Sequence, residues 1–114
     1  MALLVCFLEA SSEVDWSRKA IYLDQSFYEQ LFAYYRGLES DSPLKEMVSI
    51  GYDDEFVLAG DRISQSLDDL ENIAAAGVIG HPQVQLFSNV LRETARRGCR
   101  LVVAGDMHPD LSRA

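Results

Sequence analysis

The chain has 114 residues, a mass of 12.8 kDa and a net charge of −8, from 18 acidic and 10 basic residues. This length allows one domain, which we place at residues 1–106, and excludes two independent cores. Residues 107–114 contain a proline and no periodic pattern, so we expect a flexible C-terminal tail. The acidic balance argues against nucleic acid and anionic membranes as partners, because both select clustered Lys and Arg.

The two cysteines, Cys6 and Cys99, are too few for a disulfide scaffold, and we expect both to be reduced. The apolar run at residues 2–8 is too short to span a membrane and lacks the charged start of a signal peptide. We therefore expect a cytoplasmic protein without a membrane partner.

The first predicted element is a strand at residues 2–8 (ALLVCFL), which is apolar on both alternating faces. This pattern is typical of a strand covered on both sides. A helix should follow, with Asp24 as its N-cap and Gly37 just after its end. Its aromatic residues form two stripes, so the helix is either deeply packed or leaves tyrosines at the surface.

Pro43 predicts the first turn of a short helix that runs to about Ser49. A strand is expected at residues 56–59. Ser64 can cap a second long helix that Gly77 ends, and a third runs from Pro82 to Gly98. A strand at residues 100–104 closes the domain.

Strands separated by helices favour an α/β fold with a central, mostly parallel sheet of three to five strands, flanked by helices. The first and last strands should be neighbours, since both are apolar on two faces. A further strand is possible at residues 20–23 or at residues 48–50. Residues 56–61 (FVLAGD) resemble residues 101–106 (LVVAGD), which we interpret as two strands that end alike.

The negative charge is concentrated in residues 39–55, which hold six acidic residues and one basic residue. Such a segment can steer a basic partner into contact, and aromatic residues beside it can supply contact area. The same run could instead be a solvated face that keeps the protein soluble. As the partner-binding set we predict Glu46, Tyr52, Asp53, Asp54, Glu55 and Tyr35.

An enzymatic alternative rests on Asp61 and Asp106, each of which follows a strand through a glycine. The carboxyl ends of parallel strands meet at one edge of a sheet, so these carboxylates could bind a metal together with His108. The stretch Gly-Asp-Met-His resembles one metal-binding segment of metallophosphoesterases. A turn with a side-chain hydrogen bond explains Gly-Asp equally well. The chain has no glycine-rich nucleotide motif and no Gly-x-Ser-x-Gly, and we expect no cofactor.

A small acidic α/β domain without a catalytic signature is similar to the immunity proteins of bacterial toxin systems, such as contact-dependent inhibition and type VI secretion. The resemblance lies in the pattern of a buried first strand (residues 3–8) and a closing helix, glycine and strand (residues 84–104). It implies a domain that neutralises a cognate toxin by covering its active site or an adjacent surface. Toxins that attack nucleic acid are often basic, which would suit the acidic segment.

The sequence thus favours a protein-binding module that is not an enzyme. The alternatives are a small metal-dependent phosphoesterase-like enzyme, and a ligand-binding domain that forms homo-oligomers through the tyrosine-rich helix.

Overall fold

The computed structural model describes residues 4–9, 21–50 and 53–105, of which residues 4–9 are described by their backbone. Residues 107–114, the predicted tail, lie outside the described residues. The elements follow one another as β1 (Leu4–Glu9), β2 (Ile21–Leu23), α1 (Gln25–Tyr35), α2 (Pro43–Met47), β3 (Glu55–Leu58), α3 (Asp61–Ala75), α4 (Gln83–Arg97) and β4 (Arg100–Gly105).

The four strands form one sheet in the order β2-β1-β4-β3. The first and last strands are neighbours, with Leu4 opposite Gly105 and Glu9 opposite Arg100. The prediction of a mostly parallel sheet is wrong, because every pairing among the described strands is antiparallel.

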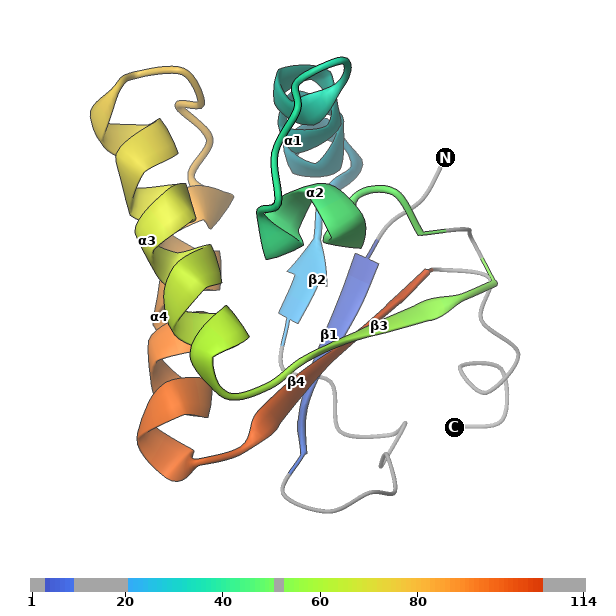
Figure 1. Cartoon of the computed structure of the whole chain (residues 1–114), viewed down its shortest axis with the longest axis vertical. Helices are drawn as coiled ribbons and strands as arrows, with labels where there is room; N and C mark the ends of the chain where they lie inside the picture. The colour runs from blue at the N-terminus through green and yellow to red at the C-terminus, as the bar shows by residue number, and fades with distance from the viewer. Residues whose placement is uncertain (1–3, 10–20, 51–52, 106–114) are drawn as a thin grey trace.

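The connection from β3 to β4 explains the antiparallel direction. A single crossover helix carries the chain back to the starting end of a sheet, so the next strand runs parallel. Here two helices, α3 and α4, pack against each other, and the second returns the chain to the end at which β3 stopped (Figure 1). The strand β4 therefore begins beside the end of β3, with Leu101 opposite Leu58.

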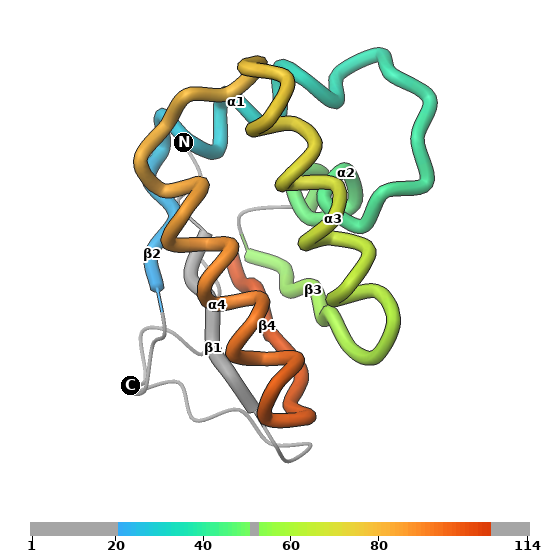
Figure 2. The backbone as a smooth tube through the Cα atoms, turned by 90° about the vertical axis from the view of Figure 1, so that its left-hand side faces the viewer, coloured from blue at the N-terminus to red at the C-terminus, as the bar shows by residue number. Residues whose placement is uncertain are grey.

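The helices lie on one side of the sheet, as the two views in Figures 1 and 2 show. Leu58 of β3 and Leu101 and Val103 of β4 point into the core beneath them and are completely buried. On the opposite face, Tyr22 and Val57 are 47% and 38% exposed. The two edge strands thus alternate between core and solvent, as antiparallel strands with one covered face do.

The central strand β4 is buried on both faces, as its apolar sequence predicts, since residues 101–105 are all buried. The short strand β2 coincides with the first of the two extra strands that the sequence left open. Residues 48–50, the second possibility, form a turn and a bend instead.

The aromatic residues of α1 are mostly packed inside. Phe27 and Leu31 are fully buried one helical turn apart, and Tyr28 and Tyr35 are 9% and 4% exposed. The Tyr28 hydroxyl donates to the carbonyl of Val48 at 2.9 Å. Phe27 packs edge to face on Phe87 of α4, with ring centroids 6.2 Å apart. Deep packing against both α4 and α2 therefore accounts for the double stripe in the sequence, and two tyrosines belong to the core.

Helix α3 begins three residues before the predicted cap, at Asp61, and Ser64 lies within its first turns. The residue before it, Gly60, has φ +58°, a conformation that residues with a side chain rarely adopt. A tight glycine turn thus joins β3 directly to α3 and takes the place of a serine cap. The predicted ends at Gly37, Gly77 and Gly98 are confirmed by their positive φ angles of 76°, 72° and 65°.

Candidate partner-binding surface

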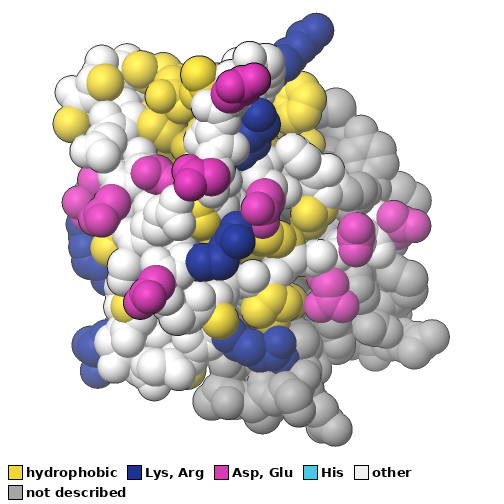
Figure 3. All heavy atoms as spheres, viewed as in Figure 1, with side chains coloured by type: hydrophobic (Ala, Val, Ile, Leu, Met, Phe, Trp, Pro, Cys, Tyr) yellow, Lys and Arg dark blue, Asp and Glu magenta, His cyan; other side chains and the backbone are white. Residues whose placement is uncertain are grey.

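Asp53, Asp54 and Glu55 are exposed, consecutive carboxylates at the point where β3 begins. We call these three residues the acidic edge, since β3 is an outer strand of the sheet. Figure 3 shows carboxylates gathered on the side of the molecule where β3 starts. With like charges in adjacent positions, this surface presents a local negative field to an approaching molecule.

The inner strand β4 forms a hydrogen bond with the backbone of the acidic edge. The N–H of Gly105 donates to the carbonyl of Asp54 at 3.0 Å, which extends the β3–β4 ladder by one residue. The Asp54 carboxylate also accepts the N–H of Glu55 at 2.8 Å through Oδ1. The carboxylates of Asp54 and Glu55 therefore stand on hydrogen-bonded backbone, so less conformational entropy is lost when a partner binds them.

Glu46 lies on α2 and is exposed, but it has a local partner. Its Oε2 is 2.6 Å from a guanidinium nitrogen of Arg62 on α3, and both side chains are about half exposed, at 54% and 45%. An exposed pair of this kind contributes little to stability. It does neutralise the Glu46 carboxylate locally, which lowers the contribution of Glu46 to the negative field.

The structure places Tyr35 inside the protein, where it cannot supply contact area to a partner. Its side chain is 4% exposed, and its hydroxyl lies 3.2 Å from the Ser42 hydroxyl. Burial raises the pKa of this phenol, with a smaller opposing effect from the Ser42 hydrogen bond. Tyr52, the other predicted aromatic anchor, lies outside the described residues.

The antiparallel sheet removes the premise of the metal-site alternative. Asp61 follows the end of β3, next to the Leu58–Leu101 pair, whereas Gly105 lies at the opposite end of this strand pair, beside Asp54. Asp61 and Gly105 thus lie at opposite ends of the β3–β4 strand pair. Asp106 and His108 lie outside the described residues. Among those described, no group of three or more His, Cys, Asp and Glu residues could hold a metal ion.

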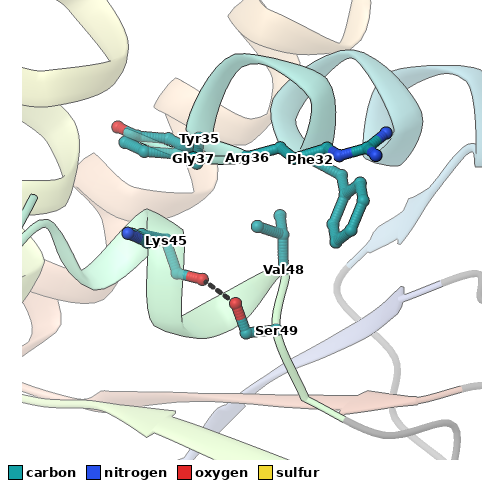
Figure 4. A pocket seen from close by; sticks show the side chains of 7 residues that line it. All are labelled: Phe32, Tyr35, Arg36, Gly37, Lys45, Val48 and Ser49. Atoms are coloured by element: carbon teal, nitrogen blue, oxygen red, sulfur yellow. Dashed lines mark hydrogen bonds between the residues drawn. The ribbon is translucent and has the colours of Figure 1, made fainter. Parts of the chain in front are cut away.

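A hollow of about 210 Å³ lies between the end of α1 and α2 (Figure 4). Its lining combines Phe32 and Val48 with two cations, Arg36 and Lys45. The Lys45 ammonium donates to the carbonyl of Leu38 and so closes the loop between the two helices. The hollow is basic and aromatic, and the described side chains lining it include no carboxylate or imidazole that could act as a general base.

No family model matches this chain, and neither a curated protein nor a solved structure is similar to it. None of the described helices is both long enough and apolar enough to cross a membrane. The functional interpretation therefore depends on the geometry of this chain alone.

Sequence reasoning expected a strand only from residue 56 and so missed that Glu55 begins the outer strand β3, just after the turn that contains Asp53. It also missed Val57, whose side chain is 38% exposed next to the acidic edge. The sequence carried little signal for this, because three of the four residues of β3 are apolar and polarity does not distinguish the exposed Val57 from its neighbours Phe56 and Leu58.

Proposed function

We propose that this domain binds a basic protein through its acidic edge and thereby covers the partner's working surface, as an immunity protein does with its cognate toxin. The single observation that carries the proposal is the set of three exposed, consecutive carboxylates where the outer strand β3 begins, two of them on hydrogen-bonded backbone. Opposite charge across such a surface raises the association rate and selects against acidic partners.

Two further observations support binding in preference to catalysis. Asp61 follows one end of the β3–β4 pair while Gly105 lies at the other, and the hollow between α1 and α2 has a lining of cations, aromatic rings and aliphatic groups. The resemblance to immunity proteins implies that the partner is encoded directly beside this protein.

The test is a binding measurement between this domain and the basic protein encoded beside it. We expect reversal of the acidic edge to Lys (Asp53→Lys, Asp54→Lys, Glu55→Lys) to weaken binding at least about a hundredfold, because charge pairs across interfaces are each worth on the order of 1.5 kcal/mol or more.

The matched control reverses three other exposed carboxylates to Lys, namely Glu29, Glu39 and Asp68. It changes the net charge by the same amount and should weaken binding only slightly. Equal losses in the two triple variants would mean that net charge, and not this surface, governs recognition. Full binding by the acidic-edge variant would reject the proposed surface.

A further inference from the structure

The two outer strands of the sheet differ in whether a side chain from a helix hydrogen-bonds to their outward-facing backbone groups. At β2, the side-chain amide of Gln83 accepts the N–H of Asp24 at 2.6 Å and donates to the carbonyl of Tyr22 at 2.7 Å. A side chain from α4 thus occupies the position that a neighbouring strand would take. Among the described residues, β3 has no such cover on its outer side.

The register shows which backbone groups of β3 face outward. Residues of an antiparallel pair alternate between those whose N–H and C=O face the partner strand and those whose groups face away. The hydrogen bond from the Gly105 N–H to the Asp54 carbonyl makes Asp54 an inward-facing position. Glu55 and Val57, one and three residues later, are therefore outward-facing. The Glu55 N–H agrees, since it donates to the Asp54 carboxylate and not to β4.

The outward groups of Val57 are consequently available to an added strand. Its N–H and C=O point away from β4, and its side chain is 38% exposed on the sheet face opposite the described helices. This geometry is the one that proteins use when they bind an extended segment as an extra strand, with main-chain hydrogen bonds giving affinity.

The carboxylates at the two ends of β3 indicate which kind of segment would bind beside this strand. The acidic edge lies at one end of β3, and Asp61 follows the other end. A second copy of this chain would bring carboxylates against carboxylates in either strand direction, which disfavours self-association through this edge. An extended segment with Lys or Arg at alternate positions would place cations beside the acidic edge.

We infer that an extended basic segment of the partner adds to the sheet as a fifth strand beside β3. This inference deepens the proposed function and depends on it, since the acidic edge is the same surface. It adds the main-chain groups of Val57 as the anchor and makes the partner's binding element a strand.

The experiment uses the whole chain and a short synthetic peptide in which lysine and valine alternate. Binding is followed by amide NMR, together with hydrogen exchange at the Val57 N–H. We expect the peptide to slow exchange at Val57, and a peptide with glutamate in place of lysine to have no effect.

Val57→Pro removes the outward N–H without removing a ladder hydrogen bond, and Phe56 before it is already in the extended conformation that a following proline requires. It should weaken peptide binding about tenfold or more. The control Val57→Thr keeps the N–H and the β-branched shape and should bind within about twofold.

The outcomes separate this inference from the proposed function. Strand addition is wrong if reversal of the acidic edge weakens peptide binding, but the Val57→Pro variant binds the peptide normally and hydrogen exchange at the Val57 N–H is unchanged. In that case the acidic edge remains the proposed binding surface. If Val57→Pro fails to fold, protection of the Val57 N–H in the unmodified chain decides alone. Absence of that protection in the saturated complex overturns the inference.

Discussion

The Ser42 hydroxyl donates to the Asp69 carboxylate at 2.6 Å and so joins the start of α2 to α3. Because its one proton goes to Asp69, the Tyr35 hydroxyl must donate to Ser42. The same oxygen accepts the N–H of Leu44 at 3.3 Å as the cap of α2. One side chain, 4% exposed, thus connects three helices and positions α2 above β3.

Replacement of Ser42 by Ala should therefore lower the free energy of unfolding by roughly 2–3 kcal/mol, since it removes a helix cap and leaves the buried Tyr35 hydroxyl without its acceptor. Urea denaturation measures this directly. Ser64→Ala is the matched control: that serine is exposed within α3, so its replacement should change stability by less than about 0.5 kcal/mol. A large loss in the control would restore Ser64 as the cap predicted from the sequence.

Gln83 provides a second test of the fold. Its side chain is 9% exposed and bonds two backbone groups of residues 22–24, so Gln83→Ala should cost about 2 kcal/mol or more. Gln85, two residues later, is exposed and bonds only Asn89 in the same helix, so Gln85→Ala should be nearly neutral. Thermal unfolding of both variants compares them. Similar melting temperatures would show that the closure of β2 by Gln83 contributes nothing.

The burial of Tyr35 leads us to expect that the protein loses stability at alkaline pH. Its pKa in the folded protein lies above the ordinary value of 10.0, mainly because of burial. The neutral phenol therefore contributes stability that is complete below pH 10 and disappears as the pH rises through the folded value. Tyr35→Phe should remove this part of the alkaline loss. Denaturation midpoints at several alkaline pH values would test this, and parallel curves for both proteins would contradict it.

Glu93 on α4 gives stability the opposite dependence on pH. Hydrogen bonds from Arg96 and Arg97 lower the pKa of its carboxyl from 4.5 to about 2. The stability linked to this group is present above pH 4.5 and is lost as the pH falls toward 2.

Carboxyl NMR of Glu93 should show a midpoint near pH 2 that returns toward the ordinary value when both arginines are replaced by Gln. Arg92→Gln should leave the midpoint in place, because Arg92 pairs with Glu71. A midpoint near 4.5 in the unmodified protein would show that the two pairs do not persist in solution.

Local patterns in the sequence predicted the helices and strands better than their arrangement. The glycines that end three helices and the apolar pattern of β4 depend on neighbouring residues, and the structure has them as expected. The strand direction depends on how α3 packs against α4, which no local pattern records. An even number of helices between β3 and β4 was visible in the sequence, and it would have favoured the antiparallel pairing.

The candidate surface, too, could be predicted from the sequence only in part. Exposure of Asp53, Asp54 and Glu55 follows from their charge. The burial of Tyr35 does not follow from its aromatic character, because it requires the partner Ser42 from another helix. Separation of Asp61 from the end of β4 likewise follows only from the sheet register.

The central claim, recognition of a basic protein by the acidic edge, is tested most directly by the association rate constant as a function of ionic strength. We expect a rate constant that falls steeply with added salt for the unmodified domain, and a much weaker salt dependence after reversal of Asp53, Asp54 and Glu55 to Lys. The triple variant of Glu29, Glu39 and Asp68 should keep most of the dependence. An identical salt dependence in the unmodified domain and the acidic-edge variant would contradict the account.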